Sequence, residues 1–412
     1  MDTQLKLSRR SLLTGTGAAS LSIGTATRSF GQTSAAPVKI GVLTDLNGPY
    51  ADLAGEGSAE AIRMAAEEFN STVLGRPVQV LAADHQNKAD VGAAIARRWF
   101  DVDGVDVIAD FSNSSVGFAV TALAKERNKI LLVAAGSSDF TGRACIPTSS
   151  QWVYNSYTNG YALAHALTAE GRKTWYIISA DYAFGHSFEA DIMRAVVDGG
   201  GKVLGAARHP LGTADFGSFL LAAQASGAQA IALANAGADT TGAVKQAVEF
   251  GIPASQTIAT PGLFISDIRS LGLPVAKGLR FVTSSYWNMD DRTIGWSKEF
   301  LRRRKAMPSM THSGMYSAAQ HYLKAVSVAK TTDGLHVAEQ MRRMPVENVF
   351  TRGGVVRADG QMVHDIFFAV VKTPEQSTSE WDLFKVTQTI PAVRAFRPLS
   401  LSECSAARTS VN

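Results

Sequence analysis

Short apolar runs alternate with segments of helical periodicity along most of this chain. Four runs near its beginning, 38–43, 78–81, 105–109 and 130–134, are nearly continuous in apolar residues. The segments between them repeat apolar residues every three or four positions, which is the spacing of an amphipathic helix. Strands that are apolar throughout are buried on both faces, so the pattern predicts a parallel sheet covered by helices on both sides.

The alternation stops at a polar break, 145–156, and then starts again. Further strands are predicted at 174–179, 202–208, 228–234, 257–260 and 279–282. Two more breaks lie near 286 and 355, and the segments 364–371 and 381–386 predict a hairpin. An alternating pattern that runs twice predicts an α/β fold of two Rossmann-like lobes, each a parallel sheet flanked by helices, joined by several crossings.

These breaks define the expected domain organisation. The first lobe is expected to comprise 37–154 plus 288–352, the second lobe 155–287 plus 353–390, and a C-terminal tail 391–412.

The N-terminal segment 1–36 has the layout of a bacterial export signal of the twin-arginine type. Arg9 and Arg10 precede a weakly hydrophobic stretch, 12–26, which is rich in Gly, Ala, Ser and Thr and is too short and polar to span a bilayer. The alternative is a chance Arg-Arg pair in an irregular N-terminus. The signal predicts that the rest of the chain works in the periplasm.

The charge of the chain falls mostly in this signal. Of the formal net charge of +4, Lys6, Arg9, Arg10 and Arg28 against Asp2 account for +3. The remainder carries no basic stripe with interleaved aromatic residues, so we expect no nucleic-acid partner.

The chain has two cysteines, Cys145 and Cys404, and neither belongs to a CxxC motif. An exported chain with an even cysteine count favours a disulfide between them. Two buried free thiols are the alternative.

Motifs of catalysis and cofactor binding are missing from the sequence. The first strand-to-helix loop lacks GxGxxG, and 237–242 has phosphate-loop glycine spacing without the required Lys-Ser/Thr. There is no GxSxG or HExxH, and the eight histidines are scattered without metal spacing. We therefore expect no enzyme activity, no cofactor and no metal site.

Several segments together resemble the leucine/isoleucine/valine-binding class of periplasmic binding proteins, the solute receptors of ABC importers. These segments are 38–45, 48–51, 181–185 and Ile252-Pro253. The resemblance implies the type I periplasmic binding protein fold, with two lobes, three hinge crossings and a small-molecule ligand in the cleft. It also implies an inner-membrane ABC permease as partner and a monomeric receptor.

Polar residues follow the third and fourth strands of the first lobe, where ligands collect in parallel sheets. In the resembled family these loops hold the ligand's carboxylate, which assigns that role to Asn113, Ser114, Ala135, Gly136 and Ser137. Helix N-termini there can offer free N–H groups to an anion. The alternative is that these residues are only helix caps and turns.

The second lobe contributes Tyr182, Phe184 and Phe264, which can enclose an apolar ligand body. The sequence offers no match for the family's amine-binding Glu, and Asp239 is the candidate substitute. Tyr286 and Trp287 either close the cleft or pack at a hinge.

The sequence thus predicts an exported solute-binding receptor of an ABC importer. Its ligand is expected to carry a carboxylate, either as a branched-chain amino acid or as an aromatic or other organic acid. The alternative is a sensor of amide-type ligands that regulates a partner protein on the same fold.

Overall fold

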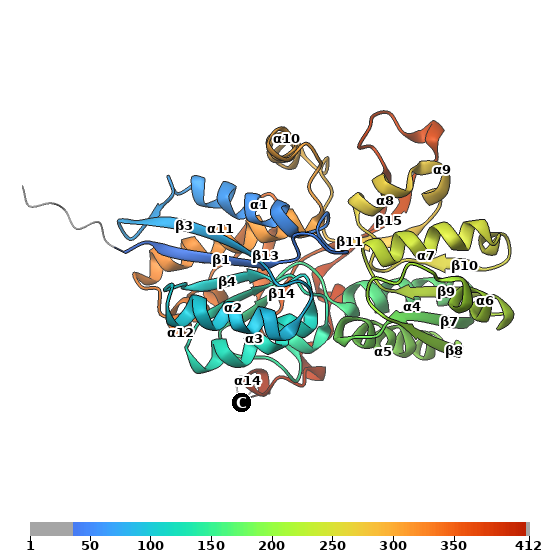
Figure 1. The fold of residues 1–412 in the computed structure, drawn as a ribbon, viewed down its shortest axis with the longest axis horizontal. Coiled ribbons are helices and arrows are strands. Elements are labelled where there is room, and N and C mark those ends of the chain that lie inside the picture. Colours follow the sequence, from blue (N-terminus) through green and yellow to red (C-terminus); the bar gives the residue numbers. More distant parts are fainter. Residues whose placement is uncertain (1–35, 409–412) are drawn as a thin grey trace, which may run out of the picture. The chain divides into compact units, whose positions relative to one another are not determined.

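Two sheets organise the part of the chain that the computed structural model describes, residues 36–408 (Figure 1). The predicted signal, 1–36, lies outside this range except for Ala36. Within 36–408, no helix is both long and apolar enough to cross a bilayer.

The first sheet has the strand order β2-β3-β1-β4-β5-β6. Its strands are β1 (Val38–Thr44), β2 (Thr72–Val73), β3 (Arg76–Asp84), β4 (Val107–Asp110), β5 (Ile130–Val133) and β6 (Ser149–Gln151). All except β2 run parallel. Every residue of β4 and β5 is buried, which confirms the prediction of central strands covered on both faces.

Helices cover both faces of this sheet. Helices α1 (Gly55–Glu67) and α11 (Met310–Ala329) pack together on one face, and α2 (Ala89–Asp101) and α3 (Ser114–Glu126) on the other (Figure 1). The helices α10 (Asp291–Arg304) and α12 (Gly334–Arg343) also pack on this side of the molecule, against α1 and β5 respectively. We call this sheet with its helices lobe 1.

The second sheet has the strand order β16-β15-β11-β10-β9-β7-β8. Its strands are β7 (Thr174–Ala180), β8 (Lys202–His209), β9 (Ala230–Ala234), β10 (Thr257–Ala259), β11 (Arg280–Thr283), β15 (Ile366–Val371) and β16 (Phe384–Ile390). The first five run parallel, and the predicted hairpin is confirmed as the antiparallel pair of β15 and β16. We call this sheet with its helices lobe 2.

The helices of lobe 2 also form two layers. Its helices are α4 (Ala162–Ala169), α5 (Ala183–Asp198), α6 (Gly217–Ala225), α7 (Ala238–Glu249), α8 (Ile265–Leu271) and α9 (Leu273–Ala276), and a π-helical turn, Tyr157–Tyr161, precedes α4. Residues of α4 and α5 share a core with Trp175 and Ile177 of β7, whereas α6 and α7 share another with Ile178 of the same strand. Because neighbouring strand residues point to opposite faces, the two layers lie on opposite sides of the sheet.

A small sheet marks the third crossing between the lobes. It consists of β12 (Val346–Glu347), β13 (Arg352–Val356) and β14 (Met362–Val363), and Gln361 forms a bridge with Gln151 at the end of β6. The sequence pattern assigned 353–390 as a whole to the second lobe. Within that range, the Gln361 side chain donates a hydrogen bond to Gln151 O at 3.2 Å.

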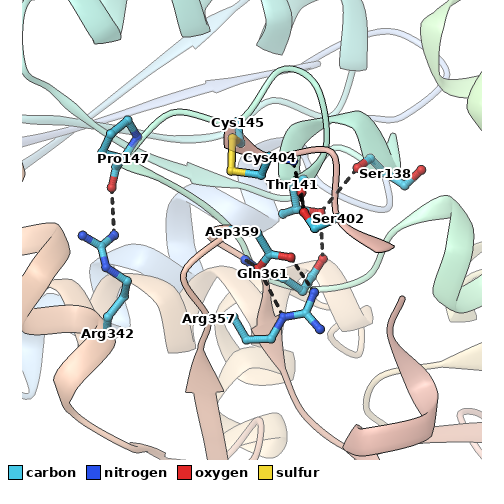
Figure 2. The surroundings of a disulfide bond; sticks show 10 residues. All are labelled: Ser138, Thr141, Cys145, Pro147, Arg342, Arg357, Asp359, Gln361, Ser402 and Cys404. Atoms are coloured by element: carbon cyan, nitrogen blue, oxygen red, sulfur yellow. Dashed lines mark hydrogen bonds and ion pairs between the residues drawn. A yellow bond between two sulfur atoms is a disulfide. The ribbon is translucent and has the colours of Figure 1, made fainter. Parts of the chain in front are cut away.

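The C-terminal tail returns from lobe 2 to lobe 1. It contains α13 (Ala392–Ala395) and α14 (Ser405–Arg408), and the structure pairs Cys404 of the tail with Cys145, as the cysteine count suggested (Figure 2). Ser402 Oγ donates to Thr141 O at 3.1 Å beside this disulfide. The tail is therefore a fourth connection between the lobes, in addition to the three hinge crossings.

Removing the disulfide is expected to destabilise the protein. The bond closes a loop with a sequence separation of 259 residues, for which chain entropy gives about 5.5 kcal/mol, before any strain in the folded state is subtracted. The Cys145→Ser/Cys404→Ser variant should unfold at lower urea than the oxidised wild type. Reductant should shift the wild type and leave the variant unchanged, and equal midpoints for the two oxidised proteins would contradict this expectation.

Candidate ligand-binding site

The two predicted carboxylate loops meet at the carboxyl edge of the first sheet. Ser114 Oγ accepts a hydrogen bond from the backbone N–H of Ser137 at 3.2 Å. Asn113 caps α3, since its Oδ1 accepts from the N–H groups of Ser115 at 2.9 Å and Val116 at 3.2 Å. This cap starts α3 at Ser114.

Both loops therefore contain helix caps, which was the plainer alternative for these residues. Ser137 Oγ accepts from Asp139 N–H at 3.3 Å at the start of a short 3₁₀ helix, Ser138–Thr141. The caps use the side-chain oxygens of Asn113 and Ser137. They leave the N–H of Ser114, in the first turn of α3, without an acceptor inside its helix.

The strand before the first loop ends in an unusual backbone conformation. Asp110 has φ of 83° and Phe111 has φ of 57°, a region that residues other than glycine seldom adopt. The Asp110 side chain is fully buried, and neither of its carboxylate oxygens has a hydrogen-bond partner. Burial raises the pKa of Asp110 to about 7, although the nearby hydroxyls of Thr44 and Ser58 lower it. Sequence reasoning missed Asp110, even though only Phe111 separates it from the polar loop.

Two tyrosines join the lobes by a hydrogen bond. Tyr182 lies at the start of α5 in lobe 2, and its Oη is 2.6 Å from the Oη of Tyr50, in the loop before α1 of lobe 1. Burial raises the pKa of both phenols well above the usual value. Both are therefore neutral at physiological pH and can each donate one hydrogen bond.

Gly136 of lobe 1 packs closely against aromatic rings, one of them Phe184 of lobe 2. A Cβ at this position would lie 2.7 Å from a ring carbon of Phe184 and 2.7 Å from one of Tyr154. Tyr154 in turn makes an edge contact with Phe264, with ring centroids 5.8 Å apart. The structure thus brings Gly136, Phe184 and Phe264 together around Tyr154, which the sequence analysis did not name.

We define the aromatic cluster by the five rings that lie in this region. These are Tyr50, Tyr154, Tyr182, Phe184 and Phe264. Tyr50 and Tyr154 come from lobe 1 and the segment that leaves it, and the other three come from lobe 2. The Tyr154 ring belongs to no helix or strand, so periodicity gave no signal for it.

Two carboxyl groups of lobe 2 lie near the aromatic cluster. Asp239 accepts from the N–H of Gly212 at 3.1 Å and lies 4.0 Å from His209 Nδ1, so it is held within its own lobe. Asp267 accepts from the N–H of Phe264 at 2.9 Å, and burial raises the pKa of Asp267 to about 7. Asp267 is a second buried carboxyl that sequence reasoning did not single out.

The lobes are in contact at these residues. Pro49 O accepts from Ala238 N–H at 3.2 Å, and Gly237, with φ of 61°, could not carry a Cβ because it would lie 2.2 Å from Pro49 O. All the predicted site residues are buried except Tyr182, which is half-buried. A molecule can therefore reach them from solvent only when the lobes separate.

A pocket of about 570 Å³ flanks this contact. It is lined by residues of α3, of the 3₁₀ helix, of α5 and of the tail. Asp191 of α5 lies in its wall and accepts from Ser138 Oγ at 2.9 Å, Ser156 Oγ at 2.7 Å and Arg397 Nη2 at 2.9 Å. One buried carboxylate thus joins lobe 1, a crossing segment and the tail.

Tyr286 and Trp287 pack at the second crossing. The Tyr286 hydroxyl donates to Trp381 O at 3.0 Å, and the indole N–H of Trp287 donates to the same oxygen at 2.9 Å. The Tyr286 ring stacks on Phe384 of β16 at 3.8 Å. These contacts favour the hinge-packing interpretation of both residues.

Residues 37–378 match the family model described as periplasmic binding protein, and the chain belongs to this family. The family implies a periplasmic location. Among curated relatives, the Leu/Ile/Val-binding protein homolog 6 of Brucella melitensis is 29% identical over 242 residues. That match covers 57% of this chain and 61% of the relative, so the chain spans less than two thirds of the relative's length.

Solved structures match almost the whole described chain. A periplasmic binding protein from Burkholderia mallei is 40% identical with a TM-score of 0.88, covering 90% of this chain and 99% of its own. A branched chain amino acid ABC transporter periplasmic ligand-binding protein from Burkholderia xenovorans is 39% identical with a TM-score of 0.80, covering 90% and 100%. These relatives are binding proteins and not enzymes, and they confirm the type I fold.

Substituting Gly136 is expected to separate the lobes without unfolding either one. The methyl group of Gly136→Ala would occupy the space of the Phe184 and Tyr154 rings. Small-angle scattering of the ligand-free variant should give a larger radius of gyration, with an unchanged circular dichroism spectrum. Gly295→Ala in α10, where nothing lies within 4 Å of the added Cβ, is the control. A radius equal to that of the wild type would show that the packing at Gly136 does not hold the lobes together.

Proposed function

We propose that this protein is an exported solute-binding receptor of an ABC importer, which closes its two lobes on a small ligand that carries a carboxylate. The observation that carries the proposal is the junction of Ser114 and Ser137 at the N-terminus of α3, next to Gly136, which packs against Phe184 of lobe 2. Lobe 1 supplies hydrogen-bond donors for an anion, and lobe 2 supplies an apolar surface. The two halves form a complete site only when the lobes are closed.

The chemistry of the junction suits a carboxylate. The N-terminus of α3 carries the partial positive charge of its helix dipole and N–H groups without helical acceptors. The hydroxyl of Ser114 can donate a further hydrogen bond, because its oxygen accepts only from Ser137 N–H. A ligand carboxylate would be held by this set without a lysine or arginine.

The aromatic cluster suits the rest of the ligand. Phe184 and Phe264 present ring faces and edges, which favour a branched aliphatic or aromatic body. The Burkholderia xenovorans relative named for branched chain amino acids supports an amino-acid ligand, as do the Brucella relatives named for Leu/Ile/Val binding. The proposed ligand classes are branched-chain amino acids and aromatic or other organic acids.

Closure around the ligand follows from a shift in population. A ligand that contacts both lobes binds the closed form more tightly than the open form, so it favours closure. The closed receptor, acting as a monomer, would then be recognised by an inner-membrane permease. We expect no nucleic-acid partner.

A thermal-shift screen tests the proposal. A ligand that binds only the folded protein raises its melting temperature, so amino acids, aromatic acids and amides should be compared at equal concentration. A carboxylate-bearing compound is expected to give the largest shift. The proposal fails if only amides bind, or if a bound compound is turned over.

Serine substitutions at the junction are expected to weaken binding of the best compound from that screen. Loss of one charge-assisted hydrogen bond costs about 1.5–3 kcal/mol, or roughly ten- to a hundredfold in affinity. Calorimetry should show this loss for Ser137→Ala and Ser114→Ala. Phe184→Ala should instead change the preference among ligands, because it removes apolar surface. If both serine variants bind as tightly as the wild type, the carboxylate lies elsewhere.

Export is expected to depend on the paired arginines of the signal. Replacing Arg9 and Arg10 with lysine should block the twin-arginine route, so the variant should accumulate uncleaved in the cytoplasm. The mature protein should begin between about Ala26 and Ala36. Periplasmic recovery of the variant at wild-type levels would instead indicate the general secretory route.

A further inference from the structure

Asp110 is a buried carboxyl group without a hydrogen-bond partner, close in sequence to the Asn113–Ser114 loop and within electrostatic range of Tyr154. It is the last residue of β4, its side chain has no exposed surface, and neither oxygen accepts a hydrogen bond. Within residues 36–408, no lysine or arginine forms an ion pair with it. A buried polar group that lacks a partner is costly, so a protein that retains one has a use for it.

The backbone around Asp110 carries a second cost. Asp110 and Phe111 both have positive φ, at 83° and 57°. Such strain persists mainly at ligand-binding and active sites, where it serves to aim a side chain. The hydroxyls of Thr44 and Ser58 lie near the Asp110 carboxyl and lower its pKa, although neither makes a hydrogen bond of ordinary geometry with it.

The surroundings of Asp110 are aromatic and acidic. The pKa of Tyr154 is raised by burial and, to a smaller extent, by the negative charges of Asp110 and Asp267. Tyr154 thus lies within electrostatic range of one buried carboxyl from each lobe. Neither carboxyl has a basic partner among the described residues. Aromatic rings together with carboxylates form the environment that proteins use to bind a cationic nitrogen.

We propose that Asp110 accepts the cationic nitrogen of the ligand, an ammonium or amidinium, while the junction of Ser114 and Ser137 holds its carboxylate. The ligand class is then a zwitterion and not a simple organic acid. Asp110 becomes the residue that discriminates between the two. This inference rests on the proposed function.

The protonation of Asp110 couples this selectivity to pH. A cation binds the ionised carboxyl, so affinity for an amine-bearing ligand should rise between pH 5.5 and pH 8 as a group with a pKa of about 7 ionises. Titratable groups on the elements around it are those of Asp45, His85, Tyr154, Asp267 and His312. Burial lowers the pKa of both histidines to about 4, so they stay neutral over this range. Asp267, whose pKa is also raised to about 7, would titrate with Asp110, and Asp110→Asn separates the two contributions.

Calorimetry with matched probes tests the proposal. L-Leucine and L-phenylalanine carry both charges, whereas 4-methylpentanoate and 3-phenylpropanoate lack the amine. Asp110→Asn should bind the preferred amino acid about ten- to a hundredfold more weakly than the wild type and should bind the deaminated acid equally well. The variant should also lose most of the rise in affinity with pH.

Asp106→Asn is the matched control. Asp106 lies just before the same strand and is also buried, but it accepts from Lys39 N–H at 3.0 Å, away from the site. Its substitution should leave the preference for amino acids unchanged.

The melting temperature of ligand-free Asp110→Asn shows whether weaker binding comes from a loss of stability. The folded-state pKa of Asp110 lies above the usual 3.8, so ionising it destabilises the folded protein as the pH rises from about 4 through 7. The variant should therefore melt higher than the wild type at pH 8 and at about the same temperature near pH 4. A lower melting temperature at pH 8 would assign Asp110 a structural role and overturn the inference.

Two failures can be told apart. If the wild type binds the deaminated acids as tightly as the amino acids, or if Asp110→Asn keeps full affinity for the amino acids, the inference is overturned and the proposed function stands. If the wild type binds none of the four probes or any other carboxylate, the proposed function fails and the inference with it.

Discussion

Parallel pairing of strands is the constraint on which the rest of this structure depends. It places the carboxyl ends of neighbouring strands at one edge of each sheet, so the loops after β4 and β5 in lobe 1 necessarily lie side by side. The same rule brings the loops after β7 and β9 together in lobe 2. Each lobe thus concentrates its polar loops and helix N-termini along one edge. The contact of Gly136 with Phe184 joins these two edges.

The chemistry at this contact is divided unevenly between the lobes. Lobe 1 offers hydroxyls, N–H groups and the unpartnered Asp110, and lobe 2 offers mainly rings together with carboxyls that are already held by backbone N–H groups. Polar groups satisfied within a lobe, such as Asp239, fix the shape of that lobe. Groups without partners depend on what enters between the lobes. Ligand binding is therefore expected at polar groups whose hydrogen-bonding capacity is not used within the protein. The helix caps at Asn113 and Ser137 hold the backbone beside these groups in place.

The sequence was sufficient for the architecture but not for all residues of the proposed site. Continuous apolar runs such as 130–134 predict buried parallel strands, because a strand that is buried on both faces is made almost entirely of apolar residues. Asp110 and Tyr154 leave no such signal, because their proposed roles depend on a positive φ at a strand end and on contacts with residues far away in the chain. The contacts of β13 and β14 leave no periodic signal either. One of them is the bridge between Gln151 and Gln361, two polar residues far apart in the chain.

The disulfide also changes the covalent topology of the chain. Because Cys145 is bonded to Cys404, the backbone between them forms a covalent ring that contains all of the strands of lobe 2 and the helices α10 to α12. A single cut by a protease anywhere inside this ring opens it without releasing a fragment. The two ends of the cut stay on one molecule for as long as the bond remains oxidised. A periplasmic binding protein built in this way tolerates a nick in one of its exposed loops that would divide a linear chain into two pieces.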